Sequence, residues 1–260
     1  MDKKTEIPED RIISSLEMRD ELRERPELDL VLMSHLPSLD RATEGFMPGE
    51  LITISGPTKH GKTLFAQSLT VEFVKQNSFP LWFSYEVAPK YFLRNFPDLP
   101  LFYMPRRLQM NAVHWVIKKM IESYEKYGTR VVFLDHLHYL FDIARSRNPS
   151  IEIGTVIRAL KTTAVQHDFI IFLLCHTRKG ASECKDLTYE SIRDSSFVGQ
   201  ESDCVLLIYR NMKNPESNEA KLYMEFHRRT GILHTTISLV KKDGFLREVP
   251  YINHNEEDTP

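Results

Sequence analysis

The residues whose types and spacing point most directly to chemistry form one short loop. It follows the phosphate-binding pattern G-x-x-x-x-G-K-[ST], with every fixed position filled. The loop consists of Gly56, Pro57, Thr58, Lys59, His60, Gly61, Lys62 and Thr63. Its glycines let backbone N–H groups wrap phosphate oxygens, Lys62 can place an ammonium on the β- and γ-phosphates, and the Thr63 hydroxyl can ligate Mg²⁺. His60 either contacts a phosphate or faces solvent, and the pattern assigns it no role.

Three further polar side chains follow apolar runs that read as strands. Asp135 follows 131–134, Glu86 follows 81–85, and His176 follows 169–175. Open α/β sheets bind ligands at the carboxyl ends of their strands. We therefore expect Asp135 to orient Mg²⁺ through bound water, Glu86 to polarise the attacking water, and His176 to sense the γ-phosphate. The alternatives are a capping or loop aspartate, a solvated loop glutamate, and a histidine that is merely hydrogen-bonded.

Alternating strand and helix patterns must position these groups. Apolar runs predict strands at 51–55, 81–85, 131–134, 169–174 and 203–209, and helical periodicity predicts helices at 64–74, 111–127 and 151–167. The last part of the chain reads as antiparallel strands at 221–226, 232–240 and 245–249, with a turn at 242–244. The expected fold is α/β, with a mostly parallel central sheet flanked by helices and C-terminal antiparallel strands.

Bulk properties are those of one soluble α/β domain with an added arm. The chain has 260 residues and a net charge of −2, and its three cysteines (Cys175, Cys184 and Cys204) show no paired metal spacing. No apolar stretch approaches the length of a membrane span, and the N-terminus lacks the apolar core of a signal peptide. We expect an intracellular, cytoplasmic protein. Residues 1–33 read as a helical arm or linker, with an amphipathic helix at 10–25 ended by Pro26, and 34–260 as the main domain.

Several segments together resemble the C-terminal RecA-type motor domain of DnaB-like replicative helicases, over roughly residues 34–250. Residues 39–51 are similar to the family's entry segment "LD..T.G..PGEL", 84–87 to "SLEM", and 135–140 to "DYLQL". Residues 193–203 resemble "LRESGAIEQDAD", 209–210 end a strand like "LLYR", and 226–231 are similar to "AKxRNG".

This resemblance implies a RecA-like P-loop fold that uses ATP and Mg²⁺, with Glu86 as the catalytic base. It also implies that Arg229 is an arginine finger reaching the ATP of the adjacent subunit, the alternative being a surface arginine in a hairpin. Two positions depart from the family pattern: His176 stands where a glutamine is usual, and His227 where a lysine is usual.

The activity implied is that of an ATP-driven, ring-forming helicase, a homo-hexamer moving 5′ to 3′ on single-stranded DNA. Loops at 145–148 and 178–193 would grip the DNA backbone, their alternative being ordinary solvated loops. Thirty-odd residues are too few for the family's N-terminal collar domain, so we expect any primase or loader to be a separate partner. Two other hypotheses stay open: a RecA-fold ATPase without unwinding activity, acting in recombination, repair or regulation, and a nucleotide-binding assembly subunit. Glu86 and Arg229 argue against the last.

Overall fold

The computed structural model describes residues 12–24, 29–141, 148–177, 192, 195–210, 214 and 216–249. The chain divides into two compact units, Met1–Leu30 and Val31–Pro260. The predicted DNA-facing segments 145–147 and 178–191, with Arg193, lie outside the described residues, as does Pro26. The larger unit carries every candidate site residue named above.

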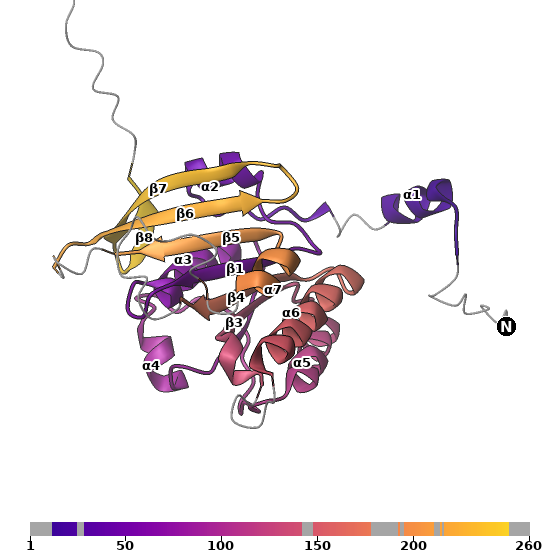
Figure 1. The fold of residues 1–260 in the computed structure, drawn as a ribbon, viewed down its shortest axis with the longest axis horizontal. Helices are drawn as coiled ribbons and strands as arrows, with labels where there is room; N and C mark the ends of the chain where they lie inside the picture. The colour runs from indigo at the N-terminus through magenta and orange to yellow at the C-terminus, as the bar shows by residue number, and fades with distance from the viewer. Residues whose placement is uncertain are drawn as a thin grey trace, which may run out of the picture. The chain divides into compact units, whose positions relative to one another are not determined.

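An eight-stranded sheet forms the centre of the larger unit (Figure 1). Its strands are β1 (Leu51–Gly56), β2 (Leu81–Ser84), β3 (Val131–Asp135), β4 (Ile170–His176), β5 (Cys204–Tyr209), β6 (Glu219–His227), β7 (Leu233–Lys242) and β8 (Phe245–Glu248). They lie in the order β2-β3-β4-β1-β5-β6-β7-β8. The first five in this order are parallel, and β6 to β8 continue the sheet antiparallel. The predicted mostly parallel sheet with C-terminal antiparallel strands is confirmed.

The helices of the larger unit include the three that periodicity predicted. These are α3 (Lys62–Lys75), α5 (Val113–Tyr127) and α6 (Pro149–Gln166). Three shorter helices, α2 (Pro37–Thr43), α4 (Pro89–Arg94) and α7 (Ser195–Glu201), were not predicted, because six or seven residues hold too few turns to show a period. No described helix has the length and apolarity needed to cross a bilayer.

The parallel strands are buried on both faces, as a sheet covered by two helical layers requires. Alternate residues of β3 face different layers. Val132 and Leu134 join the apolar cluster that includes residues of α5 and α6. Phe133 points to the other layer, where its ring stacks on Trp82 at 4.6 Å and on Phe172 at 4.7 Å between centroids. Phe73 of α3 completes that aromatic layer. Because both faces of the sheet are packed, the position of each strand's carboxyl end is fixed relative to its neighbours.

In the described part of the smaller unit, residues 12–24 and 29–30, the α-helix is α1 (Ser15–Arg23). It is shorter than the predicted helix at 10–25, because it begins after Ser14, whose side chain accepts a hydrogen bond from the Glu17 N–H. None of its residues is buried, and Leu16 and Leu22 are about half exposed, at 61% and 48%. Of the four apolar residues expected to form a stripe, Leu16 and Leu22 lie in the helix, whereas Ile12 and Ile13 precede it, so the predicted stripe is present only in part.

Candidate nucleotide-binding site

The candidate phosphate-binding loop joins β1 to α3 and requires glycine at both ends. Gly56 has φ 152°, and a Cβ there would lie 2.3 Å from the Ile208 carbonyl oxygen. Gly61 has φ 99° and directly precedes the first turn of α3. Side chains at either position would meet strain, and at Gly56 also a clash. The glycines thus permit a tight turn that ends at a helix N-terminus, where backbone N–H groups and the helix dipole favour phosphate.

Lys62 lies inside this loop. Its Nζ donates to the carbonyl oxygens of Gly56 at 2.9 Å and of Pro57 at 3.0 Å, and the residue is 5% exposed. Burial lowers the pKa of the ammonium, while the charges of Glu86 and Asp135 oppose that shift. The lysine is therefore held at the loop by two backbone carbonyl oxygens, in place to meet a phosphate.

Asp135 and Thr63 are joined across the site. The Thr63 hydroxyl donates to Asp135 Oδ2 at 2.8 Å. Asp135 is fully buried, and burial, together with the charge of Glu86, raises the pKa of its carboxyl to about 6 against the opposing effects of Thr63 and Lys62. Its other oxygen, Oδ1, is buried and has no hydrogen-bond partner among the described residues. A buried carboxylate oxygen without a donor suits a hydrated Mg²⁺, so Thr63 and Asp135 fit the metal that the motif implies.

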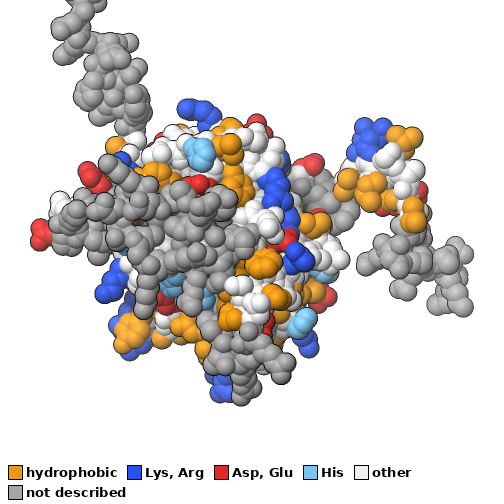
Figure 2. All heavy atoms as spheres, in the orientation of Figure 1, with side chains coloured by type: hydrophobic (Ala, Val, Ile, Leu, Met, Phe, Trp, Pro, Cys, Tyr) orange, Lys and Arg blue, Asp and Glu red, His pale blue; other side chains and the backbone are white. Residues whose placement is uncertain are grey.

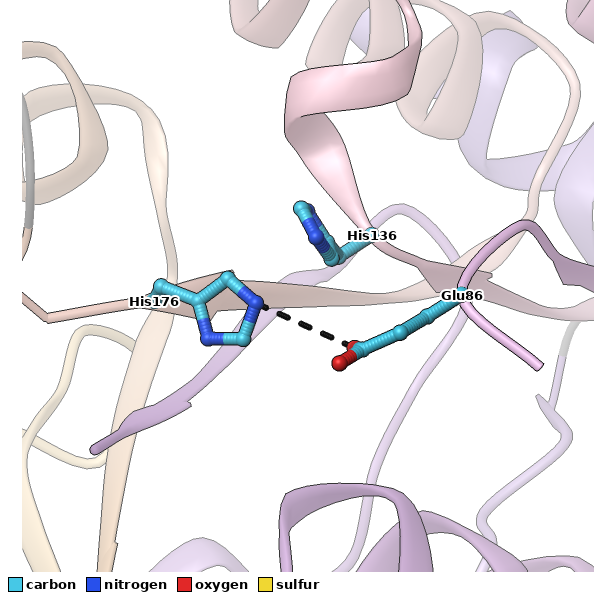
Figure 3. Close-up of side chains that lie close together, drawn as sticks. All are labelled: Glu86, His136 and His176. Carbon is cyan, nitrogen blue, oxygen red and sulfur yellow. Dashed lines mark ion pairs between the residues drawn. The ribbon is translucent and has the colours of Figure 1, made fainter. Parts of the chain in front are cut away.

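Three strand ends bring Glu86, His136 and His176 together (Figure 3). Parallel pairing aligns Ser84 with Asp135, and Asp135 with Leu174, so the residues just beyond these positions meet at one edge. His176 Nε2 lies 3.8 Å from Glu86 Oε2. The rings of His136 and His176 are 4.3 Å apart between centroids, in an edge-to-face arrangement. The structure thus brings the predicted base and the predicted sensor into contact.

His136 was not predicted as a site residue, although its place directly after Asp135 at a strand end was a usable signal. It is buried, and its Nδ1 accepts the His138 N–H at 3.3 Å. Burial, with the nearby His176, His138 and Lys62, lowers the pKa of His136 to about 3. The ring is therefore neutral near pH 7 and can accept a hydrogen bond or a metal ion.

His60 has a structural place that the sequence did not reveal. It is buried, at 7% exposed, and does not face solvent. Its Nδ1 accepts the Arg210 N–H at 3.0 Å, and its ring lies 5.0 Å from that of Tyr209. Burial lowers the pKa of the ring, which matches its role as an acceptor. His60 thus ties the loop to the end of β5.

Arg229 lies in a different region, against the segment that leads into β1. Its Nε donates to Glu50 Oε1 at 2.9 Å, and one terminal nitrogen donates to the carbonyl oxygens of Thr43 at 2.6 Å and Gly45 at 2.8 Å. A second terminal nitrogen lies 3.4 Å from Glu44 Oε2. The side chain remains 31% exposed. Several acceptors therefore hold the Arg229 guanidinium in one conformation while it remains at the surface.

His227 supports this arrangement from below. It is buried, its Nδ1 lies 2.9 Å from the Thr230 hydroxyl, and its Nε2 lies 3.4 Å from Glu50 Oε1. Burial alone would raise the pKa of Glu50, but hydrogen bonds from His227, the Met47 N–H and Arg229 lower it. His227 therefore lies against the carboxylate that holds Arg229.

The sheet places Arg229 and the phosphate loop at opposite ends of the strands. Cys204 pairs with Ile52 at the start of β1, and also with His227 at the end of the antiparallel β6. The loop, in contrast, follows Gly56 at the other end of β1. Arg229 and Lys62 of one chain therefore lie at opposite ends of the strands.

The strand order, the glycine loop before α3 and the acidic strand ends define a RecA-like P-loop fold. The chain belongs to the DnaB-like helicase C terminal domain family, whose model matches residues 93–245. That match includes Asp135, His176 and Arg229, whereas the loop and Glu86 precede it.

Individual relatives agree with this assignment. A probable replicative DNA helicase of Trieres chinensis is 24% identical over 225 residues, covering 72% of this chain and 49% of that protein. The chain thus spans about half the length of this relative. Two solved structures share the fold with a TM-score of 0.74 each. One is a DnaB-like replicative helicase studied with primase (19% identity, 93% of this chain, 68% of the other), and the second is an ATPase domain (18%, 90% and 97%).

Proposed function

We propose that this chain is the motor of an ATP-driven, ring-forming DNA helicase that moves 5′ to 3′ along single-stranded DNA. The observation that carries the proposal is the division of the catalytic groups between two edges of one sheet. Lys62, Asp135 and Glu86 converge at the carboxyl ends of the parallel strands, whereas Arg229 is fixed at the opposite end. A site assembled from both edges needs a second copy of the chain.

Each residue has a definite part in hydrolysis. The loop amides and Lys62 bind the β- and γ-phosphates, and Glu86 takes a proton from the attacking water. His176, beside Glu86, senses the γ-phosphate. Mg²⁺, held by Thr63 and through water by Asp135, would neutralise charge on the phosphate oxygens.

Arg229 acts on the nucleotide of the adjacent subunit. Glu50, Thr43 and Gly45 hold its guanidinium in one direction before any partner arrives, which reduces the entropy lost when it meets a phosphate. An arginine supplied in this way accelerates hydrolysis about 10³- to 10⁵-fold in comparable phosphoryl-transfer sites. Hydrolysis then depends on assembly, and a homo-hexameric ring satisfies that dependence at every interface.

Single-stranded DNA is the proposed track. On the face drawn in Figure 2, the basic and acidic side chains of the described residues are interspersed, so a general basic surface does not support DNA binding there. The proposal for DNA rests instead on family membership and on the loops at 145–148 and 178–193. The same proposal includes a separate primase or loader as partner. It also includes a reducing, cytoplasmic location, which suits the free buried thiols of Cys175 and Cys204.

Mixing two inactive variants tests the division of the site. Lys62→Ala removes the loop lysine from one chain, and Arg229→Ala removes the finger from another. In a random equal mixture, about a quarter of interfaces combine an intact Lys62 with an intact Arg229, so about a quarter of wild-type ATPase should return. The assay is ATP hydrolysis at low salt with oligo-dT, and each variant alone should be inactive.

Arg228→Ala is the matched control, because that guanidinium bonds the exposed Gln200 carbonyl and should be dispensable. If the mixture stays inactive while both variants assemble, Arg229 does not act between subunits. Strand displacement on forked DNA then tests unwinding, and duplexes with a single 5′ or a single 3′ tail test its direction.

A RecA-fold ATPase without unwinding activity is the second candidate. The observation that favours it is the pair of histidines at the base, where His136 and His176 flank Glu86. Such an enzyme would hydrolyse ATP and bind DNA but leave a forked substrate intact.

A further inference from the structure

The cluster of Glu86, His136 and His176 offers a chemistry that ATP hydrolysis does not require. One ligand atom from each of the three side chains lies within 4.8 Å of the others, and they come from the ends of three adjacent strands (Figure 3). Two imidazoles and one carboxylate form a ligand set that zinc uses in open sites. We propose that these residues bind Zn²⁺, and that the bound ion inactivates the ATPase by occupying Glu86.

The backbone positions of the three ligands are fixed by the sheet. β2 pairs with β3 and β3 with β4 in parallel register; His176 ends β4, and Glu86 and His136 follow β2 and β3 within two residues, so the sheet holds the chain beside each ligand. In a tetrahedral zinc site with bonds of about 2.0–2.1 Å, ligand atoms lie about 3.3–3.4 Å apart. His176 Nε2 and Glu86 Oε2 are already 3.8 Å apart. Since no pair in the cluster is more than 4.8 Å apart, closing the site brings ligand atoms together by at most about 1.5 Å.

Exposure allows the ion to enter. The side chains of His176 and Glu86 are 23% and 37% exposed, whereas His136 is buried and anchors the inner side. His136 Nδ1 accepts the His138 N–H over a long 3.3 Å. A metal on either ring nitrogen displaces that contact, since the other nitrogen must then carry the proton, but a hydrogen bond this long is weak.

Ligand chemistry separates this site from the magnesium site. Thr63 and Asp135 offer oxygen atoms only, which suit Mg²⁺. Imidazole nitrogen favours zinc and its neighbours in the first transition row over magnesium. Mg²⁺ at the concentrations needed for ATP hydrolysis should therefore leave the histidine cluster open to Zn²⁺.

Inhibition follows from the identity of the third ligand. A Glu86 carboxylate bonded to a cation no longer accepts a proton from water, so catalysis stops while the fold is unchanged. This consequence rests on the proposed role of Glu86, whereas binding of the ion does not.

Metal titration of the nucleotide-free full chain tests the site directly. Co²⁺ serves as a coloured substitute for Zn²⁺, and Zn²⁺ affinity is measured by competition with a chromophoric chelator. We expect the chain to bind one equivalent of Co²⁺ and to show the visible absorption bands of Co²⁺ in a site of low coordination number with nitrogen ligands. His176→Gln and His136→Gln should each weaken Zn²⁺ binding by about 10- to 100-fold or more, since even residues that merely orient metal ligands have effects of this size.

His114→Gln is the matched control, an exposed histidine of α5 that should bind Zn²⁺ like the wild type. Circular dichroism checks that each variant is folded. If His136→Gln fails to fold because His136 is buried, His176→Gln still tests the site, since His176 is partly exposed. Unchanged Zn²⁺ affinity in folded His176→Gln would overturn the proposal.

ATPase measurements with excess Mg²⁺ test the inactivation. Zn²⁺ at saturating concentration should abolish wild-type turnover, a zinc-selective chelator should restore it, and His176→Gln should resist Zn²⁺ relative to its own basal rate. Full activity with zinc bound would refute inactivation. Absence of ATPase with Mg²⁺ alone would instead refute the proposed function, and the Co²⁺ spectrum would still decide the metal site.

Discussion

Replacing Asp135 with asparagine should stabilise the nucleotide-free protein relative to the wild type by an amount that grows as the pH rises. Burial raises the pKa of this carboxyl from the ordinary 3.8 to about 6. The folded protein therefore holds the proton more tightly than the unfolded chain, and the wild type loses stability as pH rises between these two values. Above pH 6 the full penalty is present, about 3 kcal/mol at 1.36 kcal/mol for each pKa unit.

The penalty can be separated from other effects of the substitution by its pH dependence. Asparagine keeps an acceptor for the Thr63 hydroxyl but puts an amide near the unpartnered Oδ1 position, which has a cost that does not vary with pH. Between pH 4.5 and 7.5 the wild-type penalty grows from about 1 to about 3 kcal/mol. The difference in unfolding free energy, variant minus wild type, should thus rise by about 2 kcal/mol.

The assay is urea unfolding of both proteins in EDTA, without nucleotide, across this pH range. Asp98→Asn, at an exposed loop position, should give a flat difference curve. Adding Mg²⁺ and ATP should reverse the order, since only the wild type retains the carboxylate for the metal. A flat or falling curve for Asp135→Asn would refute the assignment of a buried, destabilising charge.

Three further predictions concern the elements that hold the site. Gly56→Ala should abolish nucleotide binding in a filter or fluorescence assay because its Cβ meets the Ile208 carbonyl, whereas Gly128→Ala, with open space around it, should bind normally. His60→Ala should cost about 1–3 kcal/mol in a urea titration because the Arg210 N–H loses its acceptor, and His234→Ala, at an exposed site, should cost little. Phe133→Ala should cost about 3–5 kcal/mol by the same measurement, and a loss below 1 kcal/mol would contradict its place in the aromatic layer.

The sheet was predictable because its strands are short, apolar and bounded by turn residues. β1 to β5 carry uninterrupted buried runs, which report a strand covered on both faces. Helices α3, α5 and α6 were predictable because each is long enough to repeat its apolar period. The short α2, α4 and α7 were not, since their sequences carry little periodic signal and their helical state depends on tertiary contacts.

Much of the candidate site was also predictable, because carboxyl ends of parallel strands share an edge. That rule alone predicts that Asp135, Glu86 and His176 lie close together. The same rule also applies to His136, which directly follows Asp135, but successive residues at a strand end point in different directions, and the rule alone does not say which of the two enters the site. It also could not reveal the support under Arg229, which involves Glu50 and His227 from segments almost 180 residues apart in the chain.

The sequence by itself determined the local chemistry of this protein. The loop from Gly56 to Thr63 predicts phosphate binding because its spacing, glycines, lysine and threonine act within a few bonds of one another. Only the tertiary structure decided which distant groups surround that loop and which stand apart from it. Strand register brought two histidines onto Glu86, and the antiparallel return of β6 carried Arg229 to the opposite edge of the sheet. Contacts of this kind depend on pairing and packing across the whole chain, and no short motif encodes them.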